Sequence, residues 1–389
     1  MIRQAALYFT TPDDVPAARL PVVGRPLAFR VVLAAVRAGV PRVALPSALR
    51  GPELAAALAT SPGARAAVTW LDTPGALADE PTLLLPAAAL APAAALARLV
   101  AAGAGHGLGA SLATDAPAVV ADRKLLAALA TAVVAGAPLG DALGRALKPG
   151  DSAPLAGWFV RVHGPRDAAE AEARLWHDLG SPIDSPLDVA VHRRLSRWVT
   201  RAAVALGIAP NAITVASGAV GLAAATAFAA GDAVAAAGGL LLYLAAVVLD
   251  HADGEVARLT LTDSPMGEWL DIAVDTLVHT ALVLALGLAA ARVAGAGLAA
   301  GGVAAAGVVA SAAVGKRWPP APAAAARRDL LDRLSSRDGF YAMLLIYVAL
   351  LGAAPASLPT LLVVIAAGTH AYWVTRALSL LRKTWRTPK

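Results

Sequence analysis

The sequence predicts two parts of different fold class, an N-terminal α/β domain followed by an all-α integral membrane domain with six transmembrane helices. The chain is 58% hydrophobic and only 15% charged, with a mean hydropathy of +0.64, which is too apolar for an ordinary soluble protein. Short apolar runs alternate with helical stretches through the first 180 residues. Beyond residue 210, apolar segments recur near the ~20 residues that a bilayer requires.

Composition also excludes several classes of function. The 389 residues contain no cysteine, so disulfides, thiolate chemistry and cysteine-based zinc sites are excluded. The net charge is +6, but the basic residues flank apolar segments and do not cluster with aromatic ones. This pattern argues against nucleic acid as a partner and favours an anionic membrane surface and phosphate-bearing substrates.

The N-terminal region reads as alternating strands and helices, which predicts a parallel sheet. The predicted strands are Arg42–Leu45, Ala66–Leu71 and Thr82–Leu85, and the predicted helices are Leu27–Ala38, Gly51–Ala59 and Ala91–Ala102. Pro86, Pro92 and Arg98 favour a strand followed by a helix, and not a membrane span, over Leu83–Ala102.

The segment Leu20–Leu27, which contains Gly24 and Arg25, and the helix after it resemble part of the nucleotidyltransferase (sugar-phosphate cytidylyltransferase-like) fold. That resemblance implies a glycine-rich, triphosphate-cradling loop after the first strand, yet Tyr8–Asp14 contains no glycine. It also implies an acidic metal ligand after a central strand, and Leu83–Ala89 has none. We therefore expect residues 1–183 to form an inactive nucleotidyltransferase-like domain, with an unrelated α/β domain as the alternative.

Residues 184–209 are expected to form a linker and a juxtamembrane helix. Apolar and basic residues alternate at helical period over 187–207, which is typical of an amphipathic helix lying along the cytoplasmic leaflet. Its basic residues, in one or two stripes, are His192, Arg193, Arg194, Arg197 and Arg201. These basic residues have two alternative explanations, attraction to anionic lipid and binding of a substrate phosphate.

Residues 210–389 are expected to form the membrane domain. The six candidate spans are 212–230, 233–250, 268–290, 293–315, 338–354 and 357–380. The connection between the fourth and fifth spans and the C-terminal tail are basic; their residues are Lys316, Arg317, Arg327, Arg328, Arg333, Arg337, Arg382, Lys383, Arg386 and Lys389. The positive-inside rule then places both termini, the N-terminal domain and the aspartate motif described next on the cytoplasmic side of the cell (inner) membrane.

Four aspartates stand at regular spacing in this apolar half, Asp250, Asp253, Asp271 and Asp275. Residues three or four apart share one face of a helix, so each pair would share a face of one helix, and two such helices could bring four carboxylates together. One alternative is a set of solvated loop carboxylates. Acidic clusters near a bilayer are costly unless a cation neutralises them, and all-oxygen ligands suit hard divalent ions.

The full pattern is D-x2-D-G-x2-A-R-x8-G-x3-D-x3-D over residues 250–275, and Pro210, Asn211 and Thr214 precede it as P-N-x-x-T. Both resemble motifs of the CDP-alcohol phosphotransferase (CDP-alcohol phosphatidyltransferase) family, and the resemblance extends loosely over residues 187–385. It implies a transferase in which a CDP-alcohol loses CMP while its phosphoalcohol group passes to an acceptor hydroxyl.

The resemblance also implies roles for the motif residues. Asp250, Asp253 and Asp271 would hold two divalent ions, Mg²⁺ or Mn²⁺, and Asp275 would be both a metal ligand and the general base. The nucleotide-binding and substrate-binding set would be Gly254, Ala257, Arg258, Gly267, Pro210, Asn211 and Thr214. Pro210, Asn211 and Thr214 are also residues that commonly begin a helix, which is an alternative explanation for them. Arg194, Arg197 and Arg337 are the candidates for an acceptor phosphate.

These observations predict a membrane enzyme of phospholipid or polyol-phosphate synthesis. The donor would be CDP-diacylglycerol or a CDP-polyol, the acceptor an alcohol or polyol phosphate, and the family resemblance suggests a homodimer. One alternative is a bifunctional enzyme whose first domain makes the CDP-alcohol. Another is a non-enzymatic cation-binding scaffold or transporter. His279, one turn beyond Asp275, reads either as a packed helix histidine or as a catalytic one.

Overall fold

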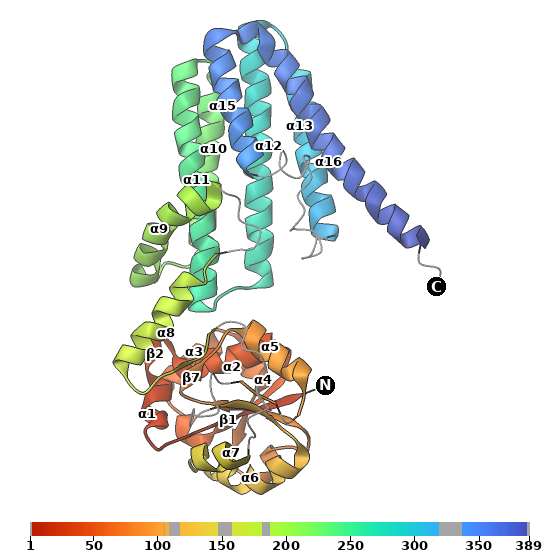
Figure 1. The fold of residues 1–389 in the computed structure, drawn as a ribbon. Helices are drawn as coiled ribbons and strands as arrows, with labels where there is room; N and C mark the ends of the chain where they lie inside the picture. Colours follow the sequence, from red (N-terminus) through yellow and green to blue (C-terminus); the bar gives the residue numbers. More distant parts are fainter. Residues whose placement is uncertain are drawn as a thin grey trace. The chain divides into compact units, whose positions relative to one another are not determined.

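The computed structural model describes residues 2–104, 106–108, 117–146, 158–180, 187–318 and 337–386 (Figure 1). The chain forms two compact units, Met1–Asp178 with Leu259–Thr262, and Leu179–Arg258 with Asp263–Lys389. Most of the predicted linker before the juxtamembrane helix, 181–186, lies outside the described residues, as do Arg327, Arg328 and Arg333.

The first unit is built on a six-stranded sheet of order β5-β4-β1-β6-β9-β8. Its strands are β1 (Gln4–Tyr8), β4 (Arg42–Pro46), β5 (Val68–Leu71), β6 (Thr82–Pro86), β8 (Gly107–Leu108) and β9 (Ala118–Ala121). The strands from β5 to β6 are parallel, with Gln4 of β1 opposite both Arg42 and Thr82. The predicted strands are therefore parallel, whereas β9, which was not predicted, is antiparallel to both β6 and β8.

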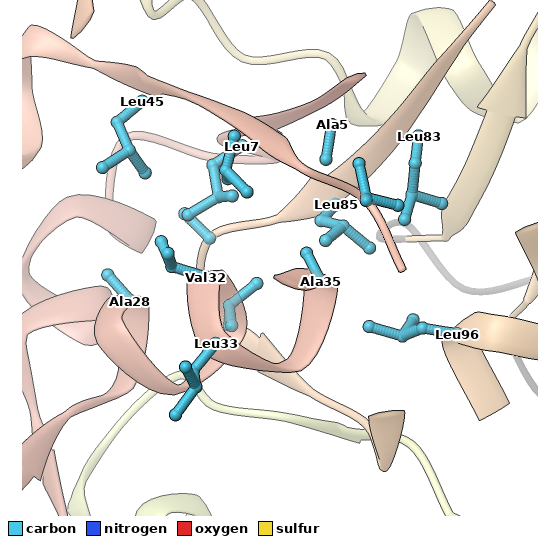
Figure 2. Close-up of a cluster of buried hydrophobic side chains, with 14 of the residues drawn as sticks. Ala5, Leu7, Ala28, Val32, Leu33, Ala35, Leu45, Leu83, Leu85 and Leu96 are labelled. Carbon is cyan, nitrogen blue, oxygen red and sulfur yellow. The ribbon is translucent and has the colours of Figure 1, made fainter. Parts of the chain in front are cut away.

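Helices cover both faces of this sheet, which explains why its strands are continuously apolar. Successive side chains of β1 point to opposite faces, so Ala5 and Leu7 join one core while Ala6 and Tyr8 join the other. Figure 2 shows the first core, in which Leu7 and Leu85 of the sheet face Val32 and Ala35 of α2. The predicted strand at Ala66–Leu71 is shorter than expected, because Pro62–Ala67 is helical.

The helices of the first unit are α1 (Asp14–Arg19), α2 (Leu27–Arg37), α3 (Pro52–Ala59), α4 (Pro62–Ala67), α5 (Ala93–Ala102), α6 (Arg123–Ala135), α7 (Gly140–Ala146) and α8 (Pro165–His177). Its short elements are η1 (Ser47–Leu49), η2 (Pro74–Ala76) and the two-residue strands β2 (Pro21–Val22), β3 (Arg25–Pro26), β7 (Ala89–Leu90) and β10 (Val160–Arg161). The segment Leu20–Leu27 forms the β2–β3 hairpin, with Val23 and Gly24 at positive φ in its turn.

The second unit is helical throughout its described residues. It comprises η3 (Asp188–His192), α9 (Arg193–Leu206), α10 (Pro210–Ala229), α11 (Ala233–Thr260, which ends in the first unit), α12 (Pro265–Ala294), α13 (Leu298–Arg317), α15 (Arg337–Ala353), η5 (Pro355–Ser357) and α16 (Leu358–Arg386). Five helices among the described residues are long and apolar enough to cross a membrane. Helix α15, the predicted fifth span, falls short at 17 residues, so the count of six stays a prediction.

Glycines let these helices approach closely. A Cβ on Gly221 of α10 would lie 2.6 Å from Val278 Cγ1 of α12, and one on Gly287 of α12 would lie 2.9 Å from the Cα of Gly301 in α13. Such small-residue contacts are typical of helix packing in membranes. They fix the spacing of α10, α12 and α13, the helices that also frame the candidate site.

We expect Gly287→Ala to lower the free energy of unfolding by about 1–3 kcal/mol, because the added methyl group meets backbone that cannot move aside. Gly302→Ala is the matched control, since nothing lies within 4 Å of its Cβ. There the better helix propensity of alanine should stabilise by up to about 1 kcal/mol. Thermal unfolding of detergent-solubilised protein would measure both, and equal effects would contradict close α12–α13 packing.

Candidate functional site

Two helices carry the aspartate motif. Helix α11 extends beyond the predicted span of 233–250 to Thr260, so the whole first half of the motif is helical. A short turn follows, and Ser264 caps α12 by accepting a hydrogen bond from the backbone N–H of Gly267. Asp271 and Asp275 then lie one turn apart on α12.

Three of the four carboxylates come together. Asp250, Asp253 and Asp271 each offer an oxygen within 4.8 Å of the others, and Asp253 is buried while the other two are half-buried. Asp275 is not part of this triad, and its side chain is 48% exposed. It lines the same cavity as Asp250 and Asp271.

The P-N-x-x-T segment opens α10 beside this triad. The Thr214 hydroxyl donates a 2.5 Å hydrogen bond to Oδ2 of Asp253. A Cβ on Gly267 would lie 3.2 Å from Oδ1 of Asn211, so a larger residue at position 267 would crowd α10. The two sequence motifs, more than 30 residues apart in the chain, therefore meet in space.

A cavity of about 410 Å³ opens against the carboxylates. Its lining residues are Asp250, Glu268, Asp271, Ile272, Asp275, Thr276, Ala312, Gly315 and Lys316. Lys316, at the end of α13, forms an ion pair with Glu268 and lies 5.0 Å from the centre of the Trp269 ring. The cavity thus presents several carboxylates and one ammonium group.

Asp275 is connected to a histidine and a tyrosine. His279 Nδ1 lies 3.2 Å from Oδ1 of Asp275 and 2.8 Å from the backbone oxygen of the same residue. Its Nε2 lies 2.9 Å from the hydroxyl of Tyr243, which is buried in the helical core. Since both Asp275 atoms are acceptors, Nδ1 carries the proton and the tyrosine hydroxyl donates to Nε2.

The remaining motif residues lie along α11. Gly254 and Ala257 are half-buried, and a Cβ on Gly254 would lie 3.1 Å from Nη1 of Arg258. Arg258 is exposed, and its guanidinium donates to the carbonyl of Leu179 at 3.3 Å. The arginine is therefore positioned at the surface of the unit beside the motif glycine.

The structure corrects the expected basic stripes of the juxtamembrane helix at His192 and Arg193, while Arg194 and Arg201 are exposed. His192 is fully buried, and Arg193 pairs at 2.9 Å with Glu255, a fully buried residue of α11. Ser196 and Thr200 donate to the same Glu255 carboxylate at 2.9 and 2.7 Å. Helix α9 thus turns a polar face inward because α11 presents a buried carboxylate there.

The structure describes the side chains of two of the three predicted phosphate-binding arginines. Arg194 is exposed and Arg197 half-buried on α9, and neither is among the described residues that line the cavity. Arg337 begins α15, and its side chain lies outside the described ones.

Sequence reasoning missed Glu255, Tyr243 and Lys316 as parts of the site's surroundings. The sequence did contain a signal for a buried polar partner such as Glu255. Polar residues recur every four positions at Asp188, His192, Ser196 and Thr200 and form a stripe on one helix face. No such pattern marks Tyr243, whose hydroxyl finds its partner only through the packing of α11 on α12.

Comparison with known proteins supports the reading of the motif. Residues 207–381 match the family model of CDP-alcohol phosphatidyltransferase, so this part of the chain is a domain of that family. The match takes in the aspartate motif and the P-N-x-x-T segment. No curated protein matches the chain.

The family and the five apolar helices together indicate a membrane-bound transferase of the phosphotransferase kind. The family generally uses divalent metal ions, a CDP-alcohol donor and an alcohol acceptor. The triad of carboxylates offers the oxygen ligands that such ions require.

We expect Thr214→Val to weaken Mn²⁺ binding by about tenfold, because groups that orient a metal ligand typically contribute that much to affinity. Thr226→Val is the matched control on the same helix, since its hydroxyl donates only to the carbonyl of Ala223 and is exposed. Electron paramagnetic resonance of free Mn²⁺ during titration would measure both. Equal Mn²⁺ affinities in the two variants would mean that the Thr214 hydroxyl does not contribute to metal binding.

Proposed function

We propose that this chain transfers a phosphoalcohol group from a CDP-alcohol to an acceptor hydroxyl and releases CMP, in phospholipid or polyol-phosphate synthesis. The observation that carries the proposal is the carboxylate triad of Asp250, Asp253 and Asp271, which opens onto a cavity of about 410 Å³ within the family domain. A transporter would not need the Gly254, Ala257 and Arg258 set beside it.

The carboxylates present fit two divalent ions, Mg²⁺ or Mn²⁺. Three carboxylate oxygens within 4.8 Å repel one another strongly unless a cation lies among them, and the donor set is all oxygen. Asp250, Asp253, Asp271 and Asp275 would hold the ions. When bound, the ions would neutralise charge on the phosphoryl oxygens and on the departing CMP.

Asp275 is suited to the role of general base. It lines the cavity, is half-exposed and stands one helical turn beyond the triad, where an acceptor hydroxyl can reach it. The Nδ1–H of His279, fixed in turn by the Tyr243 hydroxyl, restricts the orientation of the Asp275 carboxylate. His279 is therefore a positioning residue in this proposal.

The donor would lie along α11. Small residues at Gly254 and Ala257 let the cytidine approach the helix, and the Arg258 guanidinium pairs with phosphate. Gly267, Pro210, Asn211 and Thr214 hold α10 and α12 close at the nucleotide end.

The acceptor would enter from the cavity's basic side. Lys316 is a cavity-lining cation, so it joins Arg194, Arg197 and Arg337 as a candidate for an acceptor phosphate. We place the active site and both termini on the cytoplasmic side of the inner membrane, and we expect a homodimer through the membrane helices.

The first unit is proposed to be a scaffold without nucleotidyl transfer activity. In the loop after β1, where the resemblance implies a triphosphate cradle, the Asp14 carboxylate accepts the backbone N–H of Thr10 at 2.6 Å and the Thr10 hydroxyl at 2.5 Å. Arg161 pairs with the same carboxylate at 2.9 Å. A buried internal anion thus occupies donors that a phosphate would need.

The test is CMP release from CDP-diacylglycerol, CDP-inositol and CDP-glycerol with candidate acceptors. We expect release to require Mg²⁺ or Mn²⁺ and to fall by about 10²–10⁴-fold in Asp275→Asn, because the general base is lost. Asp232→Asn, on the exposed loop before α11, is the control for removal of one carboxylate.

Release that is independent of metal, or that survives Asp275→Asn, would overturn the mechanism. Absence of release with every donor would favour the scaffold reading. CTP turnover by the full-length protein would support the bifunctional alternative.

We expect Tyr243→Phe to lower kcat by about two- to tenfold with little change in KM, because one hydrogen bond in the chain that orients Asp275 is lost. Tyr347→Phe is the matched control: its hydroxyl is equally buried but donates to the carbonyl of Leu286, away from the cavity. Steady-state kinetics of CMP release would measure both. A loss of kcat that is as large in Tyr347→Phe would mean that Tyr243 acts through stability alone.

A further inference from the structure

A second cluster of metal-ligand side chains lies beside the aspartate triad in the helical unit, with Nδ1 of His251 4.0 Å from Oδ2 of Asp250. Asp188 and His192 of η3 and His251 of α11 each offer a ligand atom within 4.8 Å of the others, and all three residues are buried. His192 Nδ1 is 2.8 Å and His251 Nε2 is 3.1 Å from the same oxygen, Oδ1 of Asp188.

The hydrogen-bonding requirements of His251 point to a cation at this place. Its Nδ1 lies 3.0 Å from the carbonyl oxygen of Val247, which can only accept, so Nδ1 carries a proton. In the neutral ring, Nε2 then bears a lone pair directed at a carboxylate oxygen 3.1 Å away. Two electron-rich atoms at that distance repel each other unless a proton or a metal ion lies between them.

The surroundings of the cluster resemble a built metal site. A backbone carbonyl that fixes the tautomer of a histidine, as Val247 does here, is the usual outer partner of a metal-bound imidazole. The segment that carries Asp188 and His192 is a turn of π-helix, a conformation that is frequent at functional sites. The ring of His192 is fully buried and stacks at 5.2 Å on that of Tyr341, which fixes its orientation toward Asp188.

We propose that Asp188, His192 and His251 bind one transition-metal ion of the zinc class. Two imidazole nitrogens and one carboxylate are the donors that such ions prefer, whereas the all-oxygen triad suits Mg²⁺ or Mn²⁺. Because His251 directly follows Asp250 in α11, the ion anchors η3 and the start of α9 to the helix that carries the first two motif aspartates.

The test counts metal and does not depend on transferase activity. Full-length protein in detergent is stripped with a chelator, loaded with Zn²⁺, and filtered in excess Mg²⁺ so that the aspartate site holds the harder ion. We expect about one zinc ion per chain in the wild type and in Asp271→Asn, and about a tenfold or greater loss in His192→Gln. Inductively coupled plasma mass spectrometry measures the ratio.

A second measurement needs no variant. Co²⁺ bound by imidazole nitrogen gives visible ligand-field bands, and we expect the wild-type protein to show these bands in excess Mg²⁺. Wild-type protein that retains neither Zn²⁺ nor the Co²⁺ bands would overturn the proposal and leave a proton between His251 and Asp188. Retention by a folded His192→Gln protein equal to that of the wild type would also overturn it, and loss of all zinc in Asp271→Asn would assign the ion to the aspartate triad.

Discussion

The structure of the helical unit depends on keeping several carboxylates close together inside an apolar bundle. Two like charges about 4 Å apart repel by about 4 kcal/mol at the effective dielectric near a protein surface, and Asp250, Asp253 and Asp271 place three oxygens within 4.8 Å. Packing must hold the helices that bear them. Gly218 and Gly221 of α10 accept Val274 and Val278 of α12 so closely that no Cβ would fit without a shift. Helix α10 also carries Thr214, which donates a hydrogen bond to Asp253 of α11, so the helix whose packing stabilises the bundle also contributes to the geometry of the site.

A second buried charge explains the unusual orientation of α9. An amphipathic helix ordinarily turns its apolar face to the protein, yet here Asp188, His192, Ser196 and Thr200 face inward. Glu255 supplies the reason, since a buried carboxylate is costly unless it is paired and fully hydrogen-bonded, and α9 provides its partners. Several large apolar residues of the helix are left outside, with Trp198 71% and Leu206 75% exposed. An exposed apolar face beside exposed Arg194 is the combination that a membrane interface accommodates.

A structural feature of this protein could be predicted only where it leaves a pattern in the sequence. The aspartates were visible because a helix converts their spacing into proximity, and the strand and helix runs of the first unit were visible as apolar periodicity. The antiparallel β9 was not, because the direction of a buried apolar strand leaves no trace in its residues. The separation of Asp275 from the triad and the inward turn of Arg193 were also out of reach. Both depend on which face of a helix its neighbour covers, and the many alanines and glycines of this chain blur that pattern.

The sheet of the first unit does not depend on the loop that follows β1. Its sheet requires only that neighbouring residues of a strand, such as Leu83 and Leu84, reach opposite apolar cores, and Thr10 and Asp14 of the loop after β1 belong to neither core. The loop after β1 is therefore free to change, and here it closes on Asp14 of its own chain. That carboxylate is satisfied by Thr10 and Arg161 and is almost completely buried. Displacing it with a nucleotide phosphate would break a buried ion pair, which is strongly unfavourable, so the loop is stable because it holds its own anion.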